Sequence, residues 1–288
     1  MPIAELLPAE SLTDNTVYQH CLQSLQADTL VLPTIPDIAV KIRRAINNPH
    51  TTINQIARIV QIDPSITARL IHIANSPLYC GRRKTESCPE ALTRLGLNAA
   101  QDIITALALK SVFTAKTPHI RQKMQALWEH CSYVAAISMV LAHKTPGFDP
   151  DRAMLAGLIH DIGIVPIFTY ADTLAANPDQ LSQAAKALRT PIGVEIITRW
   201  DFPEDFADII RYAEDWFRKG DATASYSDVV MMAQLHSFIG KVDSKKLPKF
   251  NELPAYYKLV SGHMDVETSL NIMDEARDEI EQIRHFLH

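Results

Sequence analysis

Glycine is scarce in this sequence, and so is any excess of positive charge. Only 9 of the 288 residues are glycine, and no long segment alternates between apolar and polar residues. All-β folds need many turns and alternating strands, so this composition disfavours them and favours helices. The formal net charge is −5, which provides no overall basic field to attract nucleic acid or an anionic membrane. We therefore expect neither nucleic acid nor a membrane as a partner.

The sequence also lacks the usual marks of an exported or membrane protein. Its 4 cysteines show no CxxC spacing, and its first residues lack the basic start and apolar stretch of a secretory signal. A membrane-spanning helix needs about 18 or more uncharged apolar residues in a row, and no such run occurs. We expect a cytoplasmic protein in a reducing compartment.

Helix-capping signals recur along the chain. Thr52-x-x-Gln55 has the form of a capping box, and Asp63-Pro64 supplies an N-cap followed by proline at the first helical position. Asp149-Pro150 and Thr190-Pro191 predict the starts of two further helices. Apolar residues at spacings of three and four predict a long helix from Pro118 to about His143. The sequence therefore predicts an all-α fold.

The C-terminal half contains three more predicted helices. One follows Pro203 and extends to about Lys219, a second covers 225–240, and the last covers 265–288. The last helix is amphipathic, which is compatible with a partner helix or a dimer. We expect its apolar side to pack against the body of the protein itself.

The dipeptide His160-Asp161 lies inside an apolar run, 156–167. An ionised carboxylate there needs a metal ion, a hydrogen-bond donor or water, because an unpaired buried charge costs several kcal/mol. We expect both side chains to be buried. On the helical wheel His130 lies about 60 degrees from Leu127, at the border of the buried face of its helix, a position that suits either a metal ligand or a structural histidine.

Several short motifs extend over roughly residues 20–240. They are Leu32-Pro-x-x-Pro36, Asp63-Pro64, Ala74-Asn75-Ser76-Pro77, Glu90-Ala91-Leu92-x-Arg94-Leu95-Gly96, Gly193-x-Glu195 with Trp200-x-x-Pro203, and Ile209-Ile210-Arg211-Tyr212. Together they resemble the HDOD family, the HD-related output domain of bacterial signalling proteins. The resemblance implies an all-α fold with an N-terminal helical subdomain, 15–115, packed on an HD-like helical subdomain, 116–240. A loop and a C-terminal helical extension, 241–288, would follow.

The resemblance also implies a metal site. HD enzymes bind one or two metals through a His, an adjacent His-Asp pair and a later Asp. Carried over to this sequence, His130 matches the first position, and His160 and Asp161 match the pair. Gln234 stands where the later Asp would be, and an amide is a weaker ligand for a hard cation. Glu214, beside a position where relatives often carry a His-His pair, is the other additional ligand candidate.

These features lead to two functional expectations. The first is a signalling module that binds a protein partner in trans or a small phosphorylated ligand. Its metal site would be degenerate, and a divalent ion (Mn, Mg, Fe, Ni or Zn) would occupy it partially or not at all. The alternative is a metal-dependent phosphohydrolase, a phosphatase or phosphodiesterase, in which Asp161 serves catalysis and a bound water attacks phosphorus.

Overall fold

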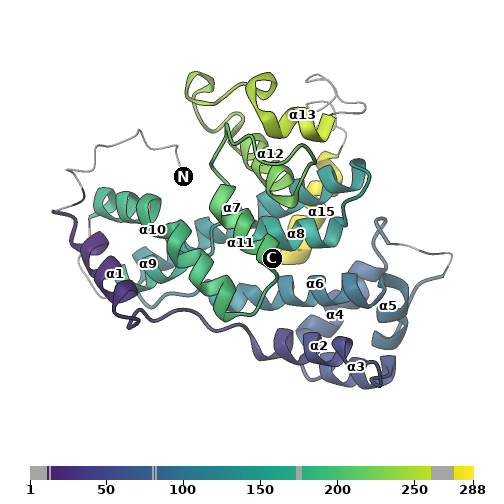
Figure 1. Ribbon diagram of the computed structural model, residues 1–288. Coiled ribbons are helices and arrows are strands. Elements are labelled where there is room, and N and C mark those ends of the chain that lie inside the picture. The colour runs from purple at the N-terminus through teal and green to yellow at the C-terminus, as the bar shows by residue number, and fades with distance from the viewer. Residues whose placement is uncertain (1–11, 13, 80, 82, 173–176, 261–275) are drawn as a thin grey trace. The chain divides into compact units, whose positions relative to one another are not determined.

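The computed structural model describes residues 12, 14–79, 81, 83–172, 177–260 and 276–288 (Figure 1). Every regular element in these ranges is a helix, which confirms the expected all-α fold. The chain separates into two compact units. Unit 1 comprises 1–34 and 113–281, and unit 2 comprises 35–112 and 282–288.

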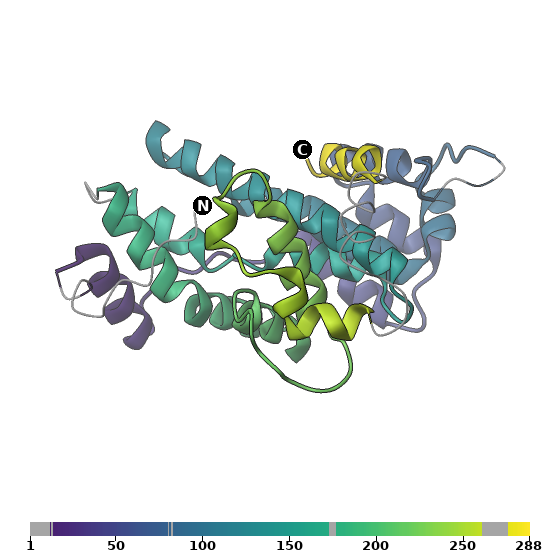
Figure 2. The ribbon, with the colours of Figure 1, turned by 90° about the horizontal axis from the view of Figure 1, so that it is seen from above.

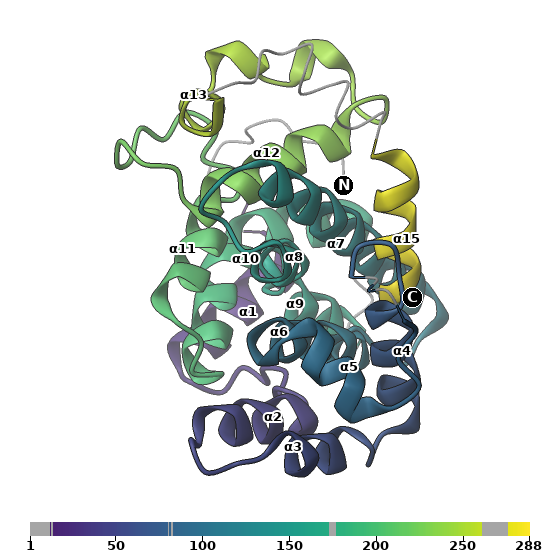
Figure 3. The ribbon, with the colours of Figure 1, turned by 90° about the vertical axis from the view of Figure 1, so that its right-hand side faces the viewer.

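Unit 1 is built around the short apolar helix α8. Its helices are α1 (Thr16–Gln26), α7 (Pro118–Lys144), α8 (Pro150–Ile159), α9 (Ile164–Ala171), α10 (Pro178–Arg199), α11 (Glu204–Tyr212), α12 (Tyr226–Phe238) and α13 (Pro254–Val260), with short 3-10 turns at Ser244–Lys246 and Phe250–Glu252. Helix α8 packs against α7, α11 and α12, and Figure 3 shows it in the middle of this group. Helix α7 is a single unbroken helix (Figure 2). The predicted long helix is therefore confirmed.

Unit 2 contains the helices whose caps are clearest in the sequence. They are α2 (Asp37–Asn47), α3 (Ile53–Val60), α4 (Pro64–Ala74), α5 (Cys88–Leu95) and α6 (Leu97–Leu109), followed by a 3-10 turn at Lys110–Val112. The side chains of Thr52 and Gln55 form the predicted capping box of α3. Asp63 accepts hydrogen bonds from the first backbone N–H groups of α4, as expected. Local sequence therefore sets these helix starts.

The two units differ in extent from the expected subdomains at both ends of the chain. Helix α1 belongs to unit 1 because it packs on α9 and α10, and the amide of Asn15 donates to the carbonyl of Gln180 at 2.8 Å. The last residues of α15 (Arg277–Leu287) belong to unit 2, where Phe286 contacts the ring of His72 edge-on. The first part of the predicted final helix, 265–275, lies outside the described residues.

The prediction that Thr190-Pro191 begins a helix is wrong. Pro191 lies inside α10, which begins after the N-cap Asn177. A proline within a helix leaves the carbonyl four residues earlier without its usual donor. That carbonyl belongs to Ala187, and both Ala187 and Pro191 are exposed, so water can satisfy it. The cost of the proline is therefore low enough for α10 to continue.

Helix α11 is shorter than the sequence suggests. It ends at Tyr212 and not near Lys219. The chain turns after Tyr212, and the guanidinium of Arg218 then lies 3.7 Å from the centre of the Tyr212 ring. Glu214 consequently lies in a turn and not on a helix.

The segment Pro150–Ala171 is the one described stretch that is long and apolar enough to cross a membrane. Of its most apolar window, 89% is buried inside the protein. The segment also consists of two helices, α8 and α9, separated by the turn that contains His160 and Asp161. Its hydrophobicity is explained by its place in the core of unit 1.

Gly163 allows this turn to approach α10 closely, and Gly193 leaves room on α10 for the side chain of Ile210 from α11. A Cβ atom on Gly163 would lie 1.9 Å from the carbonyl oxygen of Arg189 and 2.6 Å from the backbone nitrogen of Gly193. A Cβ atom on Gly193 would meet the side chain of Ile210 at 2.8 Å. Only glycine at 163 therefore leaves room for the backbone of α10 beside the His160-Asp161 turn.

We predict that Gly163→Ala lowers the free energy of unfolding by about 3 kcal/mol or more, because backbone atoms cannot yield to the added methyl group as a flexible side chain can. Urea unfolding followed by circular dichroism measures this change. Gly81→Ala is the matched control, since the nearest atoms to its added Cβ lie 3.4 Å away or farther. Equal stability of the two variants would contradict the close approach.

Candidate metal and ion-pair site

Three predicted site residues converge in unit 1. His130 comes from α7, and His160 and Asp161 come from the turn after α8. One ligand atom from each of the three lies within 4.8 Å of the other two. His160 and Asp161 are both buried, which confirms that expectation. The close packing of α7 on α8 brings together residues that are 30 positions apart in the sequence.

His160 has one nitrogen fixed by the backbone and one directed at the cluster. Its Nδ1 lies 2.7 Å from the carbonyl oxygen of Gly157, which can only accept, so we assign the proton to Nδ1. The other nitrogen, Nε2, is buried and makes no hydrogen bond. It lies 3.4 Å from Oδ2 of Asp161. In the neutral ring this nitrogen presents a lone pair, which is the form that binds metals.

His130 completes the cluster from α7. Its Nε2 lies 3.7 Å from Oδ2 of Asp161, and its ring stacks on Phe238 with the ring centres 5.8 Å apart. Burial, together with the neighbouring His160, lowers the pKa of His130 to about 3, although Asp161 opposes the shift. His130 is therefore neutral at physiological pH and also offers a lone pair.

Asp161 uses its two carboxylate oxygens for different partners. Oδ2 faces the two imidazoles, whereas Oδ1 accepts a hydrogen bond of 2.6 Å from Nη1 of Arg189. Burial by itself raises the pKa of Asp161, but the guanidinium of Arg189 opposes this effect and helps to hold that pKa well below its usual range. Asp161 is therefore ionised, and the buried guanidinium of Arg189 compensates its charge.

Arg189 also binds the carboxylate of Glu214. Its Nη2 lies 2.9 Å from Oε2 of Glu214, and the amide of Gln234 donates to Oε1 of the same carboxylate at 3.4 Å. Both residues considered as additional ligands thus contact each other. Glu214 lies outside the group of His, Cys, Asp and Glu ligand atoms that converge within the described residues.

Arg189 is the site residue that the sequence reasoning missed. The buried positions of α10 include Leu181, Ala185, Leu188, Ile192 and Ile196, and Arg189 lies on the same face. A charged residue on an apolar face is the signal that could have revealed it. The mistaken helix boundary at Thr190-Pro191 divided this pattern and concealed it.

The donor set fits a divalent cation. Nε2 of His130, Nε2 of His160 and Oδ2 of Asp161 all present lone pairs toward one another, and the buried His160 nitrogen has no hydrogen-bond donor. Such an arrangement is favourable only when a cation, a proton or a water molecule lies among the three atoms. Two imidazoles and one carboxylate oxygen suit transition metals better than magnesium, which prefers oxygen ligands.

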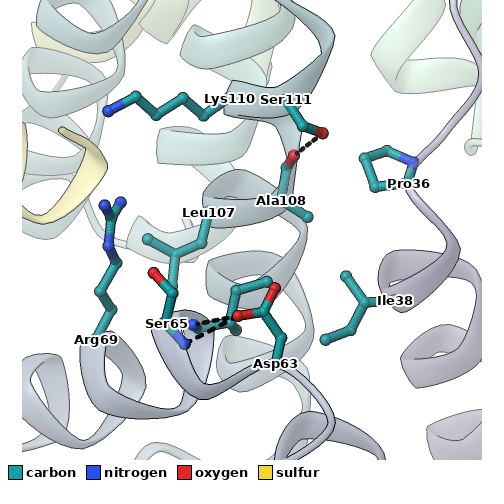
Figure 4. Close-up of a pocket in the computed structure, with 10 residues that line it drawn as sticks. Pro36, Ile38, Asp63, Ser65, Arg69, Leu107, Ala108, Lys110 and Ser111 are labelled. Atoms are coloured by element: carbon teal, nitrogen blue, oxygen red, sulfur yellow. Dashed lines mark hydrogen bonds between the residues drawn. The ribbon is translucent and has the colours of Figure 1, made fainter.

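Unit 2 has a separate hollow of about 370 Å³ (Figure 4). Arg69 and Lys110 lie at its margin, and both donate to the backbone carbonyl of His288. The carboxylate of Asp63 is directed to the backbone N–H groups of Ser65 and Ile66. The charged groups of this hollow are therefore engaged in capping α4 and in holding the end of α15.

The all-α fold, with a His on α7 close to a His-Asp pair in the turn after α8, has the arrangement that the resemblance to HD proteins implies. Comparison with known proteins makes this more specific, because the model of the HDOD domain matches residues 32–216. The chain belongs to the HDOD domain family. This confirms the resemblance inferred from the motifs.

Two solved structures are similar over nearly the whole chain. A protein from Shewanella amazonensis SB2B, provisionally named a metal-dependent phosphohydrolase, is 25% identical with a TM-score of 0.79, covering 94% of this chain and 98% of that one. An HDOD domain protein of unknown function from Geobacter sulfurreducens is 25% identical with a TM-score of 0.66, covering 96% and 97%. An uncharacterised protein of Treponema pallidum is 24% identical over 204 residues, which are 63% of this chain but only 37% of that protein.

The shifted pKa of His130 predicts acid sensitivity. The unfolded chain binds a proton at this histidine near pH 6.5, whereas the folded protein does so only near pH 3, so stability falls as the pH drops below about 6.5. We expect the unchanged, chelator-treated protein to lose about 2 kcal/mol more stability between pH 7 and pH 5 than His130→Gln does. Urea unfolding at each pH measures this. His119→Gln, an exposed position on the same helix, is the control and should retain the full loss.

Proposed function

We propose that this protein is a cytoplasmic regulatory module of bacterial signal transduction that acts by binding a signalling partner in trans or a small phosphorylated ligand. The observation that carries this proposal is the pairing of Arg189 with both Asp161 and Glu214. Hydrolysis at a metal site benefits from a firmly held ion and from a carboxylate that accepts a proton from water. Arg189 binds one oxygen of each carboxylate, so neither carboxylate is left unpaired to serve as that proton acceptor.

We further propose that a single divalent ion binds among His130, His160 and Asp161. The orphaned Nε2 of His160 supports this, because an ion would supply its missing partner. Only one carboxylate oxygen faces the position, and the same carboxylate also binds a guanidinium, so the affinity for a dication is reduced. The bound ion would strengthen the contact between α7 and the turn after α8.

The alternative function is a metal-dependent phosphohydrolase. The convergence of three ligand atoms and the similarity to the Shewanella amazonensis protein favour it. An ion held by His130, His160 and Asp161 would supply Lewis acidity for activating water and polarising a phosphoryl oxygen. Arg189 would then orient Asp161 through Oδ1, and it would need to release Glu214 before it could contact a substrate.

Metal binding provides the first test. After removal of metals with a chelator and titration with Mn²⁺, elemental analysis should find a single ion per chain in the unchanged protein. His160→Gln removes the orphaned nitrogen and should abolish this binding. His119→Gln should bind Mn²⁺ as the unchanged protein does. Unaltered Mn²⁺ binding by His160→Gln would exclude the proposed site.

Turnover provides the second test. We expect no hydrolysis of phosphomonoesters or phosphodiesters by the protein loaded with Mn, Ni, Fe or Mg above the rate of the metal ion alone. Asp161→Asn keeps the size of the side chain but removes its charge, and thermal unfolding shows whether this variant remains folded. Hydrolysis by the unchanged protein that disappears in folded Asp161→Asn would establish the phosphohydrolase in place of the regulatory module.

A further inference from the structure

The carboxylate of Glu214 is held as a protein holds a bound oxyanion. One of its oxygens, Oε2, lies 2.9 Å from Nη2 of Arg189. The other oxygen accepts a hydrogen bond of 3.4 Å from Nε2 of Gln234. Two donors on different helices, α10 and α12, thus each contact one oxygen of the same anionic group. A guanidinium is the donor that best matches planar or tetrahedral oxyanions.

The two donors are fixed, whereas the anion they hold is not. Arg189 is 8% exposed and Gln234 is 1% exposed. The Glu214 side chain is 41% exposed and lies in the turn beyond the end of α11. In addition, Nη1 of Arg189 donates to Asp161, and this second hydrogen bond fixes the plane of the guanidinium. If Glu214 leaves, the donors therefore remain directed at the same position.

Gln234 contributes an unused acceptor next to this position. Its Oε1 is buried and has no hydrogen-bond donor. Leaving a buried acceptor unpaired costs about 1–3 kcal/mol. A hydroxyl group of a ligand whose oxyanion contacts Nε2 would satisfy Oε1 of the same amide. The cradle therefore suits a small molecule that carries both an oxyanion and hydroxyl groups.

The charges favour a phosphoryl group over a carboxylate. Asp161 and Arg189 neutralise each other, so departure of Glu214 leaves their pair without net charge. A divalent ion at the histidines then adds two positive charges, which a phosphomonoester dianion balances and a carboxylate does not. Asp161 connects the two positions, because Oδ2 faces the histidines and Oδ1 contacts Arg189. An ion and a phosphoryl group would thus lie on either side of one carboxylate.

We propose that Arg189 and Gln234 form an oxyanion-binding cradle in which Glu214 occupies the position of the phosphoryl group of a small phosphorylated ligand. This rests on the proposed function, for which it names the donors and the ligand class. The ligand displaces Glu214 and thereby releases the turn after α11 from Arg189 and Gln234. Metal and phosphoryl group each raise the affinity for the other, because such coupling is reciprocal.

The test uses phenyl phosphate as the probe and isothermal titration calorimetry on the full chain, first without metal. Glu214→Gln removes the competing charge, so it should bind phenyl phosphate about tenfold more tightly than the unchanged protein does. Glu204→Gln is the matched control, since this exposed carboxylate pairs with the surface residue Arg211, and it should leave the affinity unchanged. Equal affinity of Glu214→Gln and the unchanged protein would overturn the proposal.

Two double variants identify the donors. Combining Glu214→Gln with Arg189→Lys keeps the positive charge at position 189 but removes the guanidinium, whose two Nη atoms contact two groups at once. This double variant should lose the increase in phenyl phosphate affinity that Glu214→Gln produces. Combining Glu214→Gln with Gln234→Leu keeps the bulk of the side chain without its amide, and tests the cradle even where Arg189→Lys does not fold. Thermal unfolding identifies the folded variants. A gain that persists in either folded double variant would overturn the assignment of that donor.

Repeating the titration with Mn²⁺ separates this inference from the metal proposal. We expect Mn²⁺ to tighten the binding of phenyl phosphate to the Glu214→Gln protein. Mn²⁺ should have no such effect on the double variant that also carries His160→Gln. If Mn²⁺ binds normally but phenyl phosphate does not, the cradle fails and the metal site stands. If phenyl phosphate binds through Arg189 in a protein that binds no Mn²⁺, the metal site fails and the cradle stands.

Discussion

The buried ion pair between Asp161 and Arg189 is the interaction on which the site depends. Either charge alone would be strongly destabilising in the interior, and removing one partner of a buried pair typically costs about 3–5 kcal/mol. The pair joins the turn after α8 to α10, and the absence of a side chain at Gly163 gives the backbone of α10 room to approach. The same pair divides the two oxygens of Asp161 between the histidines and the guanidinium. Packing, charge balance and ligand geometry are therefore decided together at this contact.

The guanidinium of Arg189 is a permanent positive charge in the site, present whether or not a metal ion is bound. Arg189 is charged at any physiological pH. Burial opposes this charge, but attraction to the carboxylates of Asp161 and Glu214 outweighs burial and raises the pKa of Arg189. A metal ion would share Asp161 with this guanidinium, which lowers its affinity, while an anion at Nη2 would gain from it. These charges agree with our proposal that the site binds one ion and one oxyanion. Membership of the HDOD family, together with similarity to a provisionally named phosphohydrolase, agrees with a protein that kept the helical framework of an HD site.

The elements that the sequence predicted correctly are those with local causes. Thr52 and Gln55 cap α3 through contacts three residues apart, and Asp63-Pro64 starts α4 by the same kind of local chemistry. Thr190-Pro191 has a similar local signature but fails, because solvent exposure of Ala187 and Pro191 makes a proline tolerable within α10. Whether Ala187 and Pro191 are exposed depends on the folded chain, so the Thr190-Pro191 dipeptide alone does not reveal it. The same mistake hid Arg189, since its place on a buried face becomes visible only when α10 is read as one helix.

Periodicity, neighbouring residues and recognisable motifs were enough to predict the helical class, the caps of α3 and α4, the family, and the burial of His160 and Asp161. Tertiary structure alone decided which charges pair. Asp161, Arg189, Glu214 and Gln234 come from different elements, and each lies 20 to 28 positions along the chain from the next. The sequence offered Glu214 and Gln234 as substitutes for a lost metal ligand, whereas the fold places them beside Arg189. Coulombic pairing depends on distances of a few ångströms in space, and no local pattern encodes such distances across four packed elements.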